Sequence, residues 1–181
     1  REYFKQISKA VLKSALFDEN GNPVCMIGNF PWIGDSGWGA IFPCNLDPDI
    51  PDGYGKFDMD VSYKSAFEHY KKQEARLDGF ALDSYGGYGD DKRINFRREH
   101  FKYVDFPLTF SLKEKQPVIV QYFSIIEWTK ALAEKYHPQG LLLMANCAWG
   151  QAPAFLIFSA PYLDVFEAEA PCNSDPRYIR Y

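Results

Sequence analysis

The sequence lacks the short motifs by which metal and nucleotide sites are usually detected. Its four cysteines include no C-x-x-C pair, and its three histidines include no pair at metal-ligand spacing, which argues against the common zinc sites. No G-x-G-x-x-G or P-loop follows a predicted strand, and no G-x-S-x-G is present, which argues against nucleotide binding and serine hydrolase chemistry. We therefore expect no metal and no cofactor, and cysteines that are free thiols, with a disulfide as the alternative.

Positive charge and long apolar runs are also scarce. The net charge at pH 7 is −4 and the isoelectric point is about 5.4, which argues against nucleic acid or an anionic membrane as the partner. No run of about 18 apolar residues occurs, so we expect no membrane-spanning helix. No signal peptide is recognisable and the first residue is Arg rather than Met, so we expect a processed or truncated chain.

Helical periodicity and apolar runs alternate along the chain. Periodic segments with capping residues predict helices at 3–13, 62–76, 124–136 and 152–159. Unbroken apolar runs predict strands that are covered on both faces at 39–44, 79–82, 141–146 and 163–170. Asn20-Gly21 predicts a hairpin turn. Because strands alternate with helices, the chain is predicted to be an α/β protein with a parallel sheet.

Polar residues follow the predicted strands where each strand ends, as they do at the mouth of a (β/α)8 barrel. They are Asn45 and Asp47, then Asp83, then Asn146, then Glu169. A doubly wound sheet fits the same order, but the lack of a nucleotide motif weakens that alternative. Since a barrel takes about 250 residues, we expect residues 1–181 to form one (β/α)8 TIM-barrel domain that is a fragment. It would carry about strands three to six, with 86–116 as a long βα insertion.

Two carboxylates that flank a glycosidic bond are the minimum apparatus for its hydrolysis, one as nucleophile or base and the other as proton donor. Asp83 and Glu169 have the required side chains near the ends of two predicted strands. Glu167 lies two residues before Glu169 and shares its face of the strand, so it is the alternative acid/base. An Asp after a strand is also a common turn former, which is the competing interpretation of Asp83.

Four further residues are candidates for binding a sugar: Asn146, Tyr85, Trp149 and Asp47. Aromatic residues make up 17% of the chain, and Tyr85 and Trp149 could stack on sugar rings or pack at the rim of the site. Asn146 could bind a sugar hydroxyl or stabilise a turn. The segment around Asp47 also suggests a calcium loop, but its spacing departs from D-x-D-x-D-G and it contains two prolines.

The residues between Trp38 and Ala170 resemble a group of large bacterial proteins identified as TIM-barrel glycoside hydrolases. The shared pattern is D-G-x-x-x-D-S at 78–84, R-R-E-H at 97–100 followed by P-L-T-F, M-A-N at 144–146, and a strand that ends in Glu. More distantly, the chain is similar to retaining α-glycosidases whose nucleophile is an Asp at the end of the fourth barrel strand.

This resemblance implies that Asp83 is the nucleophile and Glu169 the acid/base. It makes the strands at 79–83, 141–146 and 163–169 barrel strands four, five and six, with strand three at 39–44. The sixth strand carries two Glu residues where the resembled group has one, so the acid/base stays open between Glu169 and Glu167.

From the residues and the resemblance we expect a retaining glycoside hydrolase that cleaves O-glycosidic bonds of a carbohydrate in polysaccharide degradation. The expected partners are the carbohydrate substrate and the remainder of a larger barrel chain, with no nucleic acid and no membrane. The expected location of such a bacterial protein is extracellular or periplasmic. The alternatives are a non-catalytic carbohydrate-binding protein with the same aromatic residues, and an α/β enzyme of another class.

Overall fold

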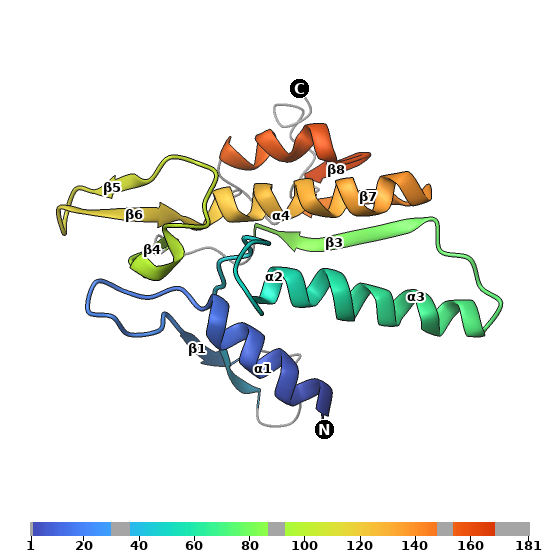
Figure 1. The fold of residues 1–181 in the computed structure, drawn as a ribbon, viewed down its shortest axis with the longest axis horizontal. Helices are drawn as coiled ribbons and strands as arrows, with labels where there is room; N and C mark the ends of the chain where they lie inside the picture. Colours follow the sequence, from blue (N-terminus) through green and yellow to red (C-terminus); the bar gives the residue numbers. More distant parts are fainter. Residues whose placement is uncertain (1, 30–36, 87–92, 148–153, 169–181) are drawn as a thin grey trace.

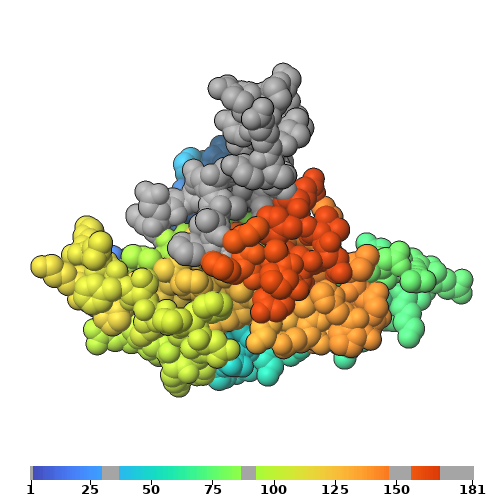
Figure 2. Space-filling view, turned by 90° about the horizontal axis from the view of Figure 1, so that it is seen from above, coloured from blue at the N-terminus to red at the C-terminus, as the bar shows by residue number. Residues whose placement is uncertain are grey.

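The computed structural model describes residues 2–29, 37–86, 93–147 and 154–168. In these residues the chain has a mixed α/β fold with three small sheets, one of which is parallel. Figure 1 shows the parallel sheet with helices α3 and α4 in the middle and the N-terminal helix to one side. Figures 1 and 2 show an elongated body, with the β5–β6 hairpin at one end and the α3–β3 connection at the other.

The strands are β1 (Met26–Asn29), β2 (Trp38–Ile41), β3 (Gly79–Tyr85), β4 (Ile94–Asn95), β5 (Thr109–Ser111), β6 (Gln116–Val120), β7 (Leu142–Cys147) and β8 (Val165–Ala168). The α-helices are α1 (Glu2–Ser14), α2 (Tyr54–Phe57), α3 (Tyr63–Lys72) and α4 (Gln121–Tyr136). The π-helical turn η1 (Asp58–Ser62) joins α2 to α3, and the 3-10 segments are η2 (Arg98–His100), η3 (His137–Gln139) and η4 (Ala154–Tyr162). None of the helices in these ranges is long and apolar enough to cross a membrane.

The parallel sheet has the order β3-β7-β8. This confirms that three of the predicted strands are parallel, and they lie side by side in the sheet in the order in which they occur in the chain. Helix α4 lies in the connection from β3 to β7, and η4 lies in the connection from β7 to β8. A Cβ atom on Gly79 would lie 2.1 Å from the carbonyl oxygen of Leu142. The glycine of the D-G-x-x-x-D-S motif is therefore what lets β3 approach β7 so closely.

Helix α4 covers one face of this sheet and forms the main core with it. Leu82, Leu143 and Ala145 from the strands are buried against Ile125 and Leu132 of α4. The opposite face is not covered by the described residues, because the side chains of Leu142 and Val165 are 52% and 47% exposed there. The prediction that the strands are covered on both faces is therefore wrong for the part of the chain that the structure describes.

The predicted barrel is not closed in the described ranges, where β3 and β8 are the two edges of a three-stranded sheet. The strand predicted at 39–44 is also corrected: its first residues form β2, which pairs antiparallel with β1 and not with β3. Pro43 has no N–H for a sheet ladder, and Cys44 forms only an isolated bridge with Ala15. The predicted insertion at 86–116 contributes β4 and β5 to an antiparallel sheet with β6.

The side chain of Arg97 holds the C-terminal end of α1. Its Nη1 donates to the carbonyl oxygens of Leu12 and Lys13 at 2.9 and 3.0 Å, and carbonyls at a helix end have no partner within the helix. The guanidinium also lies 4.6 Å from the ring centroid of Phe17. Arg97 therefore caps α1 from a position far along the chain.

His100 makes a second connection to the same helix end. Its Nε2 lies 2.9 Å from the carbonyl oxygen of Lys13, so Nε2 is the donor, and its Nδ1 accepts from the side-chain amides of Asn45 and Asn95. Burial, followed by the nearby charge of Arg97, lowers the pKa of His100 to about 4. The imidazole is therefore neutral at physiological pH and acts as part of the core.

Candidate active site

Three polar side chains lie in a row across the C-terminal ends of β3, β7 and β8. Asn146 is the register partner of Glu167 in the β7–β8 ladder, and its Nδ2 donates a hydrogen bond to Asp83 Oδ1 at 3.0 Å. Register partners project from the same face of a sheet, so one carboxylate flanks Asn146 on each side. Asp83 and Glu167 are exposed, whereas the Oδ1 atom of Asn146 is buried without a hydrogen-bond partner among the described residues.

The backbone at Asp83 leaves the regular ladder. Leu82 pairs with Ala145 and Tyr85 pairs with Cys147, so β3 contains one extra residue between these pairs. Ser84 lies at this bulge and has a φ of 51°. This left-handed conformation costs roughly 1–2 kcal/mol for a residue with a side chain. Bulges and positive φ values re-aim side chains and are frequent at active sites. This bulge sets the direction of the Asp83 carboxylate.

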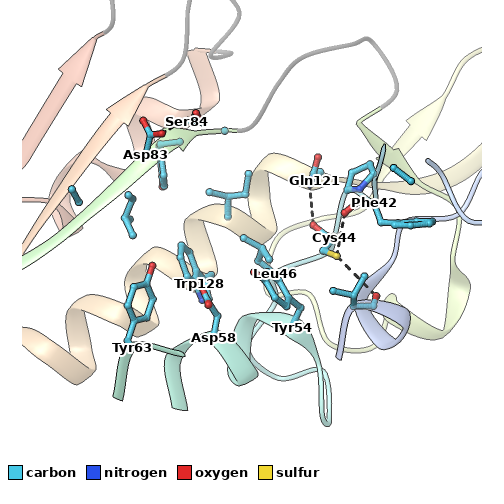
Figure 3. Close-up of a pocket in the computed structure, with 18 residues that line it drawn as sticks. Phe42, Cys44, Leu46, Tyr54, Asp58, Tyr63, Asp83, Ser84, Gln121 and Trp128 are labelled. Atoms are coloured by element: carbon cyan, nitrogen blue, oxygen red, sulfur yellow. Dashed lines mark hydrogen bonds between the residues drawn. The ribbon is translucent and has the colours of Figure 1, made fainter. Parts of the chain in front are cut away.

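A cavity of about 550 Å³ lies beside this row, along the outer edge of β3. Its walls come from β3, from residues 40–46, from α2 and η1, and from α4. Figure 3 shows Asp83 and Ser84 at the end of β3, across the cavity from Asp58 and Trp128. The volume lies within the range of small-molecule sites, and the aromatic rings of Tyr63 and Trp128 contribute to the lining.

Asp58 is a second carboxylate of this cavity and was missed by the sequence interpretation. Burial raises its pKa above the usual range, and a hydrogen bond from the Ser62 side chain opposes this only in part. Burial, followed by the charge of Asp58, raises the pKa values of Tyr54 and Tyr63. Asp58 lies in the π-helical turn η1, and such turns are frequent at functional sites. No sequence pattern distinguishes that turn from ordinary helix.

Two further groups of the cavity have defined chemistry. The thiol of Cys44 is buried and its pKa is raised to about 12, so it is not a nucleophile at neutral pH. Gln121 donates from Nε2 to the carbonyl oxygen of Cys44 at 2.9 Å. The Oε1 atom of Gln121 is buried without a hydrogen-bond partner among the described residues. It is therefore a free acceptor for a ligand hydroxyl group.

The expected stacking role of Tyr85 is corrected by the structure. Tyr85 borders the cavity, but its side chain is only 4% exposed and belongs to the core. Its hydroxyl is hydrogen-bonded to Thr129 Oγ1 at 2.6 Å and to Ser159 Oγ at 2.5 Å. The bulge explains this: the extra residue between Leu82 and Tyr85 returns Tyr85 to the α4 side with Leu82, whereas regular alternation would have put it on the face of Asp83.

Asp47 also does not join Asp83. Asp47 is 1% exposed and lines a separate pocket with Glu127 of α4. The expected substrate-binding role of Asp47 at the barrel mouth is therefore not supported. Glu169 and Trp149 lie outside the described residues, so the structure leaves their predicted roles as predictions.

Comparison of the chain with protein-family models, with curated proteins and with solved structures finds no match. The likeness to glycoside hydrolases therefore stays a prediction from sequence motifs. A function has to be proposed from the residues of the site and their geometry, because function depends on the site and not on the fold.

Proposed function

We propose that this chain carries catalytic carboxylates of a glycoside hydrolase, with Asp83 as the nucleophile. The observation that supports the proposal is the row Asp83–Asn146–Glu167 across three adjacent parallel strands. Active sites of (β/α)8 enzymes are built at the C-terminal ends of such strands. In the proposed scaffold, β3, β7 and β8 are three consecutive strands of a barrel.

The spacing of the strands fits a pair of catalytic carboxylates. One strand separates β3 from β8, and two inter-strand spacings amount to about 10 Å between backbones. An Asp and a Glu that lean toward the strand between them bring their carboxyl groups closer than that. The range used by glycosidases, from about 5 Å for retention to about 9.5 Å for inversion, is therefore within reach of Asp83 and Glu167.

Each residue of the row has a defined role in the proposed reaction. Asn146 and the Ser84 hydroxyl hold the Asp83 carboxylate from two sides, at 3.0 and 3.4 Å. Asp83 attacks the anomeric carbon and forms a glycosyl-enzyme while Glu167 or Glu169 protonates the leaving oxygen. The same carboxyl group, now ionised, then removes a proton from the water that releases the sugar.

The neighbouring cavity supplies a place for the sugar ring. Trp128 is fixed by a hydrogen bond from its Nε1 to the carbonyl oxygen of Gly55 at 3.0 Å. Trp128 is buried behind the cavity wall, and in the proposed complex the partly buried ring of Tyr63 contacts the apolar face of the sugar. Asp58 and Gln121 bond its hydroxyl groups, Asp58 through its carboxyl group and Gln121 through its unpartnered Oε1.

Hydrolysis of aryl glycosides with good and poor leaving groups tests the assignment. Asp83→Asn should lower kcat by about 10³-fold or more on every substrate, because no covalent intermediate can form. The acid/base variant, Glu167→Gln or Glu169→Gln, should lose activity on alkyl glycosides by about 10²–10⁴-fold and keep it on dinitrophenyl glycosides, which need no proton. Asp78→Asn removes an exposed carboxylate at the first position of the same motif, at the opposite end of β3 from Asp83, and should leave kcat unchanged.

The stereochemistry provides a second measurement. In NMR spectra of the first product formed, a retaining enzyme gives the same anomer as the substrate. Asp83→Asn with activity within a few-fold of the parent would refute the proposal. A parent chain that binds sugars saturably but hydrolyses none, with binding intact in Asp83→Asn, would favour a carbohydrate-binding function instead.

A further inference from the structure

A strongly acidic pocket of about 280 Å³ lies between residues 47–49, residues 103–105 and helix α4. Its titratable side chains, apart from Tyr103, are Asp47, Asp49, Asp105, Glu127, Glu134 and Lys130. We call this group of residues the acidic pocket. It shares no lining residue with the cavity beside Asp83, and the proposed hydrolysis does not use it.

Two carboxylates of the acidic pocket are buried, and in each only one of the two oxygens accepts a hydrogen bond. Asp47 is 1% exposed; its Oδ1 accepts from the backbone N–H of Asp49 at 2.9 Å. Glu127 is 8% exposed; its Oε1 accepts from the backbone N–H groups of Asp105 and Phe106 at 2.8 and 3.3 Å. Asp47 Oδ2 and Glu127 Oε2 have no hydrogen-bond partner among the described residues. A buried carboxylate oxygen without a partner is costly, so each is an open position for a donor.

The cation of the acidic pocket does not fill these positions. Lys130 Nζ lies 3.9 Å from Glu134 Oε1, and about half of the Lys130 side chain is exposed. Burial raises the pKa of Asp47 to about 6 and of Glu127 to about 7, and the charges of neighbouring carboxylates add to both shifts. A bound cation would reverse this effect, because it stabilises the ionised carboxylates.

The arrangement favours a hydrogen-bonding cation over a bare metal ion. No group of three or more His, Cys, Asp or Glu side chains in the described residues is arranged to hold a metal ion. A primary ammonium group has a full positive charge and three N–H donors, and it forms charge-assisted hydrogen bonds at about 2.8 Å. The pocket volume corresponds to about nine water molecules at 30 Å³ each, which is enough for a short alkyl amine.

We propose that the acidic pocket binds an organic cation through a primary ammonium group that donates to Asp47 Oδ2 and Glu127 Oε2. The same chemistry is offered by a free alkyl amine and by the side chain of a lysine on a partner protein. Two probes separate these sources: 1,4-diaminobutane for the free amine and Nα-acetyl-lysine amide for the lysine side chain.

Thermal unfolding of the full chain at pH 8, at constant ionic strength, tests the proposal. At least one of the two probes should raise Tm saturably, by about 5 °C at concentrations well above its Kd. The probe with the lower Kd identifies the source. The double variant Asp47→Asn, Glu127→Gln should lose the rise, whereas Glu68→Gln, an exposed carboxylate on α3, should keep it.

Tetramethylammonium has the same charge without an N–H donor and should give no rise. The absence of a rise with both amines would overturn the proposal. An equal rise with tetramethylammonium, a rise with MgCl2 or CaCl2 alone, or a rise retained in the double variant would overturn it as well. None of these outcomes bears on Asp83, so the result is independent of the proposed hydrolysis.

Discussion

Replacing Glu127 by Gln should stabilise the protein, and much more at neutral and alkaline pH than at acidic pH. The amide oxygen of Gln can accept from the backbone N–H groups of Asp105 and Phe106 as Glu127 Oε1 does. The NH₂ group takes the place of Glu127 Oε2, which has no partner among the described residues. The substitution thus removes a buried charge and keeps the two hydrogen bonds.

The size of the effect follows from the pKa of Glu127, which burial raises from 4.5 to about 7. Between these values the folded protein binds more protons than the unfolded chain, so the parent loses stability as the pH rises through this interval. At 1.36 kcal/mol for each tenfold change in proton affinity, the loss reaches about 3 kcal/mol above pH 7. Glu127→Gln avoids this loss, which corresponds to a gain in Tm of about 6–12 °C for a chain of this length.

Urea unfolding followed by tryptophan fluorescence at pH 5 and pH 8, without added amine, measures the difference. The variant should exceed the parent by less than about 1 kcal/mol at pH 5, where Glu127 is still largely protonated in the folded protein, and by about 3 kcal/mol at pH 8. Glu134→Gln removes an exposed carboxylate of the same helix and should change stability by less than about 0.5 kcal/mol at either pH. A variant that is no more stable than the parent at pH 8, or equally stabilised at both pH values, would refute the reasoning.

Three further predictions concern stability. Leu143→Ala empties a fully buried site and should cost about 2–5 kcal/mol in urea unfolding. Tyr85→Phe leaves Thr129 and Ser159 without their shared partner and should cost about 1–2 kcal/mol, with sugar affinity unchanged in titration calorimetry. The pKa of His100 is lowered to about 4, so the parent should lose stability as the pH falls from 6.5 to 4, because the unfolded chain binds that proton first. His100→Gln should flatten this slope in unfolding curves measured between pH 4 and 7.

The elements of the parallel sheet could be predicted because their patterns are local. The apolar run at 141–146 and the periodic segment at 124–136 reappear as β7 and α4, within a few residues at each end. The turn at Asn20-Gly21 is confirmed by the φ of 83° at Gly21, which a glycine accepts without strain. The contact between Asp83 and Asn146 follows from the same patterns, since ends of adjacent parallel strands lie at one edge of a sheet.

The remaining features depend on contacts that are distant in sequence. The apolar run at 39–44 suits a central strand as well as a hairpin, and only its pairing with β1 decides between them. Asp47 resembles the other polar residues at strand ends, yet it lines a pocket with Glu127 and does not line the cavity beside Asp83. Asp58 gains its raised pKa from the packing around η1. The burial of Asp58 cannot be deduced from the residues that neighbour it in the sequence.

The connections that Arg97 and His100 make to α1 have a consequence for synthesis. They join the C-terminal turn of α1 to side chains that follow it by 84 and 87 residues. At about 5–20 residues per second, a ribosome needs roughly 4–17 s to make that interval. During this time the nascent helix has neither Arg97 as its cap nor His100 as its support. Helix α1 is thus made before the side chains that cap and support it, and its docking has to wait for them.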